Sequence, residues 1–355
     1  MPKTTVKNAL KRQHLVLVRP GFETTLKDEF SERFQIKGEV SCRAGIAFQQ
    51  SVKLPELDHT VFARQYLPRA LQHTGADNDA ALSFLIDRIN VMVGRSNRQS
   101  GQWTLHAFAI DDDPSLARAR SLGKKLLAHV QTKQKPLFQR YISNDQFSST
   151  ARAASDVVIQ IYCPAADDLW FSISTVADGI STSEAGFKRM KSLRGAPSRS
   201  ASKLEEALAF LGQHPKKGDT AVDLGAAPGG WSFVLARHGA HVQAIDHAEL
   251  TIDQKKLSGT IEHIKANGLK FTPEKPVDWL VCDMVMGARD TLNVLRKWHA
   301  EGAMKNFVVN VKLPKSNPWP LVAEAVKCLE SFNWKHVRAR QLIHDRSEIT
   351  LIGRK

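Results

Sequence analysis

Four charged residues in the C-terminal half of this 355-residue chain are of types that can move protons and hold hydroxyl groups: Lys203, Asp283, Lys312 and Glu348. Asp283 and Lys312 come at the ends of apolar runs of strand length, and Glu348 begins the last such run. Open α/β sheets bind ligands at the carboxyl edge of their parallel strands. We therefore predict that these side chains meet at that edge, with the last strand antiparallel.

Two lysines interleaved with two carboxylates suit methyl transfer from a sulfonium to a ribose hydroxyl, which needs the weakly acidic 2′-OH to lose its proton. A lysine whose pKa is lowered by a second cation and by partial burial can accept that proton. We predict Lys312 as the base and Lys203 as the residue that lowers its pKa and clamps the substrate. Asp283 and Glu348 then orient the two ammonium groups.

The helix KLEEALAFLG is expected to deliver Lys203. Ser202 and Glu205 fit an S-x-x-E capping box, which would place Lys203 at the first helical position. A lysine there opposes the helix dipole. Such a breach of local preference is more often functional than accidental.

Residues 220–231 read TAVDLGAAPGGW, a strand followed by a glycine-rich turn. Glycines let a ligand approach the main chain closely. The spacing is not that of the dinucleotide fingerprint, and no Gly-Lys-Ser/Thr of a P-loop follows. A cationic sulfonium cofactor suits this turn better than pyrophosphate does, because the turn also holds the acid Asp223.

The remaining elements predict a doubly wound α/β sheet. HVQAID ends in Asp246, where an acid after a second strand would hold ribose hydroxyls. The further strand candidates lie at 261–271, 277–284, 306–313, 334–342 and 348–353, and helix-like stretches lie between several of them. The last two strand candidates are close together, so we expect a seven-stranded sheet that ends in a hairpin.

The order Lys–Asp–Lys–Glu, together with DLGAAPGGW and a terminal SEIT strand, resembles the RrmJ/fibrillarin-like group of RNA 2′-O-ribose methyltransferases. Further motifs resemble the THUMP-containing bacterial members of this group, which act on a cytidine 2′-OH of 23S ribosomal RNA. These motifs are PGFE (20–23), FARQ (62–65), APSRS (196–200), KLEEA (203–207), VCDMV (281–285), KLP (312–314) and ARQLIHDR (339–346).

The resemblance implies that Lys203, Asp283, Lys312 and Glu348 are catalytic and that the cofactor is S-adenosylmethionine. It implies cofactor contacts at Asp223, Gly225, Ala227, Pro228, Gly229, Gly230, Trp231, Asp246, Asn267 and Asp283. Asn267 stands where the family usually has an acid that contacts the adenine amino group. Its amide oxygen can still accept that hydrogen bond.

The sequence lacks the residues that two other kinds of methyl transfer need. Methylation of a base amino group would call for [DN]-P-P-aromatic after the fourth strand, where Asp283-Met284-Val285-Met286 stands. Methylation of cytosine C5 needs a nucleophilic cysteine, and Cys282 lies inside an apolar strand where a buried packing role is expected.

The charge balance indicates an acidic polymer as the partner. Fifty lysines and arginines against 36 acids give a net charge of +14 and a pI near 9.7. Seven basic residues and no acid lie in 118–140, and six basic residues and no acid lie in 187–203. We predict RNA contacts at Arg118, Arg120, Lys124, Lys125, Arg194 and Arg199, with affinity that comes mostly from phosphates.

The four cysteines are far apart without a C-x-x-C spacing, so neither a metal nor a disulfide framework is predicted. The basic N-terminus lacks the apolar core of a signal peptide, and no apolar run is long enough for a membrane span. A cytoplasmic location is therefore expected, with no membrane and no required protein partner.

The first half of the chain has α+β character, with the strand HLVLVRPGFE, the alternating strand WTLHAFAI and a basic helix from residue 115. This order resembles a THUMP RNA-binding domain behind a ferredoxin-like piece. The predicted parts are a ferredoxin-like piece (1–60), a THUMP domain (61–176), a basic linker (177–200) and a Rossmann-like methyltransferase domain (201–355).

Three functions remain open at this point. The first is 2′-O-methylation of 23S ribosomal RNA, with naked or early precursor RNA as substrate. The second is 2′-O-methylation of transfer RNA, since THUMP modules commonly serve such enzymes. The third is a ribosome-assembly factor that binds RNA without catalysis, although the intact set of four charges argues against it.

Overall fold

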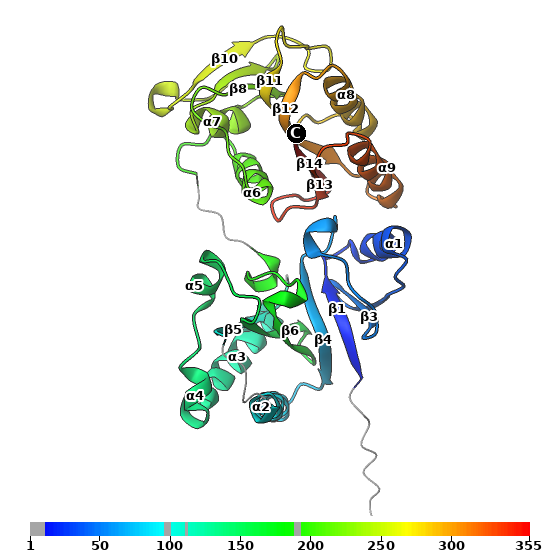
Figure 1. The fold of residues 1–355 in the computed structure, drawn as a ribbon, viewed down its shortest axis with the longest axis vertical. Helices are drawn as coiled ribbons and strands as arrows, with labels where there is room; N and C mark the ends of the chain where they lie inside the picture. Colours follow the sequence, from blue (N-terminus) through cyan, green and yellow to red (C-terminus); the bar gives the residue numbers. More distant parts are fainter. Residues whose placement is uncertain (1–10, 96–100, 111–112, 188–192) are drawn as a thin grey trace, which may run out of the picture. The chain divides into compact units, whose positions relative to one another are not determined.

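The computed structural model describes residues 11–95, 101–110, 113–187 and 193–355. The chain divides into two compact units, Met1–Lys188 and Arg189–Lys355, each built around its own seven-stranded sheet (Figure 1). The N-terminus, for which the sequence predicts no signal peptide, lies outside the described residues up to residue 10. Part of the predicted linker also lies outside them.

The sheet of the N-terminal unit has the strand order β2-β3-β1-β4-β7-β6-β5. Only β5 and β6 pair in parallel, and the other neighbours are antiparallel. The strands are β1 (Arg12–Leu17), β2 (Glu39–Cys42), β3 (Gly45–Gln49), β4 (Gln65–Thr74), β5 (Trp103–Phe108), β6 (Val157–Ala165) and β7 (Asp168–Thr175).

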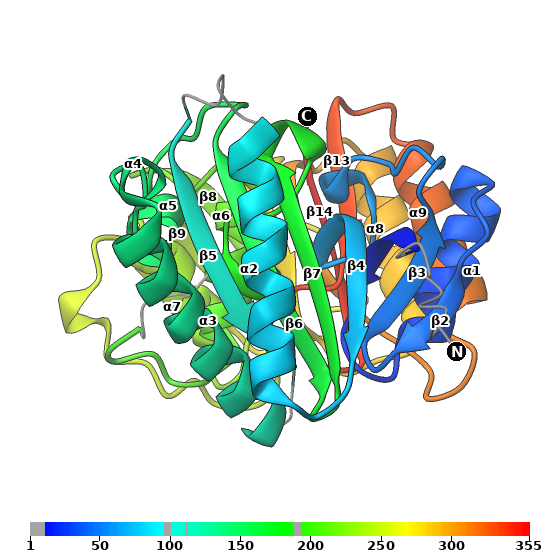
Figure 2. The same ribbon diagram turned by 90° about the horizontal axis from the view of Figure 1, so that it is seen from below.

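Helices α2 (Asn78–Arg95) and α3 (Asp113–Lys133) cover one face of β5, β6 and β7 (Figure 2). The face of α3 that packs on the sheet carries small and apolar residues at helical spacing. A Cβ at Gly123 would lie 2.7 Å from the Cβ of Ala107, so glycine allows α3 to approach β5 closely. The other helices are α1 (Glu23–Phe34), α4 (Lys135–Phe138) and α5 (Asn144–Ser149).

Strand β4 connects the two predicted parts of this unit. It pairs with β1 on one side and with β7 on the other. The strands of 1–60 and those of 61–176 therefore share one continuous sheet. The assignment of 61–176 as a THUMP domain stays a prediction.

The C-terminal unit has the predicted doubly wound sheet, in the order β10-β9-β8-β11-β12-β14-β13. Neighbouring strands are parallel except that β14 runs antiparallel to both β12 and β13. The fold class and the terminal hairpin predicted from the sequence are thereby confirmed. The strands are β8 (Thr220–Leu224), β9 (His241–Ile245), β10 (Thr260–Ile264), β11 (Val277–Cys282), β12 (Met304–Lys312), β13 (His336–Arg340) and β14 (Glu348–Arg354).

Four helices accompany this sheet: α6 (Ala201–Leu211), α7 (Gly230–Arg237), α8 (Ala288–Ala300) and α9 (Trp319–Glu330). Helix α7 follows the glycine-rich turn directly, as the βα pattern requires. Pro320 is the second residue of helix α9, where a missing backbone N–H does no harm because the first helical amides have no partner within the helix.

The start of α6 differs from the sequence prediction. The helix begins at Ala201, so Lys203 is its third residue and not its first. Among the described residues no side chain caps the first amides of α6, and the predicted Ser202–Glu205 capping box is wrong. The indole of Trp231 donates to the carbonyl of Ser200 at 2.9 Å, and this tertiary contact fixes the entry to the helix.

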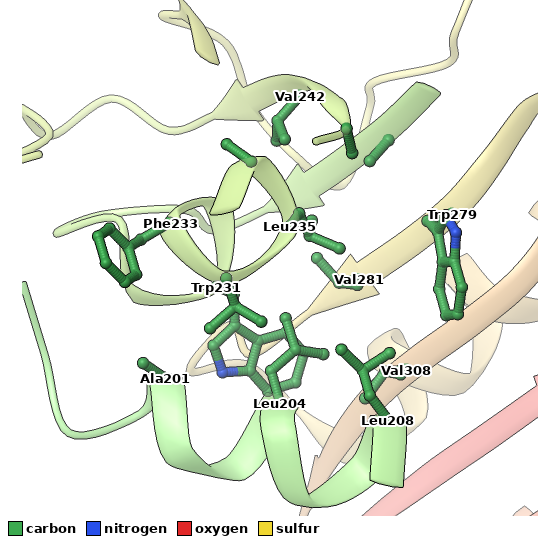
Figure 3. Packing of buried hydrophobic residues seen from close by; sticks show 14 of the residues in the cluster. Ala201, Leu204, Leu208, Trp231, Phe233, Leu235, Val242, Trp279, Val281 and Val308 are labelled. Carbon is green, nitrogen blue, oxygen red and sulfur yellow. The ribbon is translucent and has the colours of Figure 1, made fainter. Parts of the chain in front are cut away.

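The contact between α6 and α7 forms one end of the main hydrophobic core of this unit. Figure 3 shows Trp231 of α7 against Ala201 and Leu204 of α6, with Val281 and Val308 of the sheet nearby. All five side chains are at most 3% exposed. Their burial is the chief favourable contribution that holds α6, and with it Lys203, against the sheet.

No helix in the described part of the chain is long and apolar enough to span a membrane.

Leu204 is completely buried, and we expect Leu204→Ala to lower the free energy of unfolding of the C-terminal unit by about 2–5 kcal/mol. Denaturant titration followed by tryptophan fluorescence measures this. Leu269→Ala, at a side chain that is 40% exposed, is the control and should change stability by less than about 0.5 kcal/mol. Equal effects of the two substitutions would contradict the packing described here.

Candidate active site

The pairing of β12 with β14 sets two residues of the predicted tetrad opposite each other. Lys312 is the cross-strand partner of Glu348, and Asn310 is the partner of Thr350. Side chains two positions apart on a strand point to the same face. The two pairs therefore lie side by side on that face, next to Asp283, which follows the neighbouring parallel strand β11.

The structure brings all four predicted catalytic residues together. Lys312 Nζ lies 3.2 Å from Asp283 Oδ1 and contacts Glu348 Oε2. Lys203 Nζ lies 3.7 Å from Asp283 Oδ2 and contacts Glu348 Oε1. Each ammonium thus touches both carboxylates, and the formal charges of the four groups cancel.

Exposure differs among these four side chains. Lys312 is the most exposed, at 30%, compared with 15% for Lys203 and 8% for Glu348. Lys312 thus has the most accessible side chain of the three.

The protonation state of Lys312 differs from the sequence prediction. Burial by itself lowers the pKa of Lys312, but the hydrogen bond with Glu348 and the charges of Asp283 and Glu348 outweigh it and raise the pKa above its ordinary value. The prediction of a lowered pKa is therefore wrong for this state of the protein. The cause is that the two predicted carboxylates lie close enough to Lys312 to outweigh its burial. Burial acts to raise the pKa of Glu348, yet its hydrogen bonds with the two lysines lower it overall.

A second layer of buried polar groups supports the tetrad. Asn310 Nδ2 donates to Asp283 Oδ1 at 2.9 Å, which fixes the carboxylate. Thr350 Oγ1 lies 2.8 Å from Asn310 Oδ1 and 2.9 Å from Asp345 Oδ2. The Thr350 hydroxyl is the donor to both oxygens, so its single hydrogen is shared between Asn310 and Asp345. Burial raises the pKa of Asp345 well above its ordinary value.

Glu206 connects α6 to the loop between β13 and β14. Its carboxylate accepts from the backbone N–H of Ile343 at 2.8 Å and of His344 at 3.1 Å. The Nδ1 atom of His344 lies 2.5 Å from the same carboxylate. Since Glu206 is three residues after Lys203, this contact couples the helix that carries Lys203 to the chain that leads into Glu348.

The glycine-rich turn has the backbone that its sequence requires. Gly225 and Gly229 adopt positive φ values of 75° and 110°, where side chains are rarely tolerated. A Cβ at Gly225 would lie 2.2 Å from Cγ of Met284, the residue that follows Asp283. Asp246 accepts from the backbone N–H of Ala227 at 3.0 Å, so the acid after β9 holds the turn after β8.

Two predicted cofactor residues are engaged within the protein. Asp223 lies inside β8 and is 1% exposed, with its carboxylate 2.6 Å from Ser232 Oγ. Burial raises the pKa of Asp223 to about 7. The exposed Asn267 accepts through Oδ1 from the backbone N–H of Leu269 at 2.9 Å. Their contacts with a cofactor remain predictions, as do those of Pro228, Gly230 and Trp231.

Cys282 is buried in β11, and burial raises its pKa to about 12. A thiol of this kind is a poor nucleophile near neutral pH. This agrees with the packing role expected from the sequence.

The residues predicted to contact RNA do not all lie at the surface. Arg118 is 8% exposed, and its guanidinium donates to Asn78, to the carbonyl of Ala166 and to that of Gly75, so the expected surface position is wrong. The Arg118 guanidinium therefore forms its hydrogen bonds within the N-terminal unit. Arg120 pairs with Glu184 at 2.6 Å. The exposed members of the set are Lys124, Lys125, Arg194 and Arg199, and Arg120 is also half-exposed.

Sequence reasoning missed Asn310, Thr350, Asp345 and Glu206. A signal for Asn310 existed, because an asparagine in the middle of the apolar run FVVNV implies a buried amide that needs partners. Glu206 gave no such signal, since a glutamate on an amphipathic helix is ordinarily solvated.

Comparison with known proteins shows the family of this chain. The FtsJ-like methyltransferase family model matches residues 196–338, which include three of the four tetrad residues. A ribosomal RNA large subunit methyltransferase M from Xanthomonas axonopodis pv. citri is 30% identical over 96% of this chain and 98% of that protein. The chain belongs to the ribosomal RNA large subunit methyltransferase M (RlmM) family.

Other RlmM relatives match over a shorter region. The protein of that name from Xanthomonas oryzae pv. oryzae is 42% identical over 47% of this chain, and the aligned part spans only half of its length. Among solved structures, TrmN from Thermus thermophilus is 13% identical and covers 97% of this chain and 100% of that one, with a TM-score of 0.37.

Asn310→Ala removes the amide that holds Asp283, and we expect RNA methylation to fall by about 10–100-fold because the carboxylate loses its position. Stability should fall by about 1–3 kcal/mol. The control is Asn306→Ala on the same strand, which removes a buried amide bonded at 2.9 Å to the carbonyl of Asp278. It should cost similar stability and leave methylation nearly unchanged. Equal losses of activity in both variants would mean that Asn310 acts only through stability.

Proposed function

We propose that this chain is an S-adenosylmethionine-dependent methyltransferase that methylates the 2′-hydroxyl of a cytidine in 23S ribosomal RNA. The observation that carries the proposal is the set of two lysines and two carboxylates at the carboxyl edge of the sheet, beside a glycine-rich turn. Membership of the RlmM family supports ribosomal RNA as the substrate class. Cytidine and the 2′-oxygen rest on the resemblance and on the suitability of these groups for hydroxyl chemistry.

The residues around the turn fit S-adenosylmethionine. Gly225 and Gly229 have positive φ and let the chain turn sharply after β8, and the ligand carries no phosphate that would need a P-loop. Asp246 accepts one N–H at each carboxylate oxygen and keeps further lone pairs for ribose hydroxyls. When bound, the cofactor supplies an electrophilic methyl group. The backbone of Gly225, Ala227 and Gly229, together with Asp246, Asn267 and Asp283, would hold it.

The tetrad then handles the acceptor hydroxyl. Lys312 is the most exposed member and would contact the 2′-oxygen, while Asp283 and Glu348 fix its ammonium group in direction. Because its pKa is raised in the substrate-free protein, Lys312 must first give up a proton before it can accept the one from the hydroxyl. Lys203 reduces this cost by neutralising the same two carboxylates.

The proposed substrate is best tested by labelling. Purified protein is incubated with total RNA and S-adenosylmethionine labelled in the methyl group, and the labelled RNA is sized and digested to nucleosides. Label in large-subunit RNA as 2′-O-methylcytidine supports the proposal. Label in transfer RNA would favour the alternative substrate, label on a base would overturn the hydroxyl chemistry, and absence of label would favour a non-catalytic role in assembly.

Lys312→Ala and Asp246→Ala should separate catalysis from cofactor binding. Lys312→Ala should lower the methylation rate by about 10²–10⁴-fold and leave the affinity for S-adenosylmethionine nearly unchanged. Asp246→Ala should weaken cofactor binding, and a residual rate should remain at saturating cofactor. Calorimetry and single-turnover kinetics give the two quantities. A near wild-type rate for Lys312→Ala would refute the assignment of the base.

The pH dependence of the rate follows from the raised pKa of Lys312. Below that pKa the neutral amine is a small fraction that grows tenfold per pH unit, so the logarithm of the single-turnover rate should rise with a slope near one through neutral pH. Glu348→Gln removes a carboxylate that holds the proton, so the rise should level off at lower pH. An unchanged profile in this variant would show that Lys312 does not titrate in the rate-limiting step.

Charge reversal at the exposed Lys124 and Lys125 of α3 tests the proposed RNA surface. The double change to Glu should weaken RNA binding and flatten the dependence of log Kd on log salt by about 1–2 units if both lysines contact phosphate. Lys335→Glu, an exposed lysine of the C-terminal unit, serves as the control. Equal binding by the α3 variant and the wild type at two salt concentrations would show that these lysines are only solvated.

A further inference from the structure

A group of three metal-binding side chains lies in the C-terminal unit away from the tetrad. Glu205 on α6, His214 just after α6 and His238 at the end of α7 each offer one ligand atom, and these atoms all lie within 4.8 Å of one another. Two imidazoles and one carboxylate are a donor set suited to zinc and its first-row neighbours. We propose that Glu205, His214 and His238 form a binding site for a divalent transition-metal ion such as Zn²⁺.

The spacing of the donors is close to what such an ion requires. A tetrahedral zinc ion with ligands at about 2.0–2.1 Å separates neighbouring donor atoms by about 3.3 Å. His238 Nε2 and Glu205 Oε1 are already 3.4 Å apart, and the rings of His214 and His238 have centroids 5.1 Å apart. A movement of the exposed His214 side chain toward the other two donors would complete the set.

One polar atom of the group, the buried Nε2 of His238, is poorly satisfied. Its approach to Glu205 Oε1, at 3.4 Å, is at best a long contact. A buried, unpaired polar atom is costly, and a metal ion would satisfy it.

A metal ion binds neutral imidazoles and an ionised carboxylate, so the affinity of this site should fall at acidic pH. The exposed Arg237 is the charged neighbour that opposes a cation.

The location gives the site a structural consequence. The ion would join the middle of α6 to the end of α7, and α6 carries Lys203 one half-turn before Glu205. Bound metal should therefore stabilise the helix pair that holds the tetrad lysine. This departs from the expectation of no metal, which rested on the spacing of the cysteines and did not consider histidines brought together by the fold.

Metal binding by the full, untagged chain tests the proposal directly. Zn²⁺ is titrated against a chromophoric chelator, and Co²⁺ is followed by its visible absorption. The wild type should bind one equivalent, and His214→Asn should bind at least about tenfold more weakly, since one of three ligands is lost. Zn²⁺ should raise the melting temperature of the wild type and not that of His214→Asn.

Two further variants keep the result decisive. His336→Asn removes a histidine at the edge strand β13 and should bind like the wild type. Glu205→Gln removes the carboxylate charge and repeats the test if His214→Asn does not fold. Equal affinities in the wild type and the folded ligand variant, or no binding up to about 1 mM Zn²⁺, would overturn the site. Neither outcome depends on whether the protein methylates RNA.

Discussion

The antiparallel pairing of β14 with β12 is the constraint on which the site depends. Because β14 runs antiparallel to β12, it begins at the sheet edge where the parallel strands end. Glu348 therefore lies directly across from Lys312. A one-residue slip in this pairing would turn the carboxylate to the opposite face. The pair Asn310–Thr350, one step further along the same face, helps to hold the register through its hydrogen bond.

From this pairing the remaining parts of the site follow in order. Asp283 ends the strand next to β12, and α6 brings Lys203 to the same two carboxylates. The glycine-rich turn lies after β8, the strand on the other side of β11. Asp283 therefore stands between the turn and Lys312, and Met284 packs against Gly225 of the turn.

Much of this could be predicted from the sequence, because the strands are continuous apolar runs and the tetrad residues mark their ends. The start of α6 could not, since the indole of Trp231 and not a capping side chain fixes it. The pKa of Lys312 was predicted in the wrong direction because the sequence places both carboxylates near Lys312 but does not show that their effect outweighs its burial. The burial of Arg118 was hidden for a related reason: its partners are largely backbone carbonyls from distant loops.

The central claim is that two carboxylates hold Lys312 as an ammonium group before substrate binds. The most direct measurement is the pKa of Lys312 in the free protein, followed by the ¹³Cε chemical shift in lysine-labelled protein and assigned with Lys312→Arg. The account predicts a pKa above the ordinary value of 10.5. A pKa below that value would contradict it and restore the lowered-pKa base as the resting state of the site.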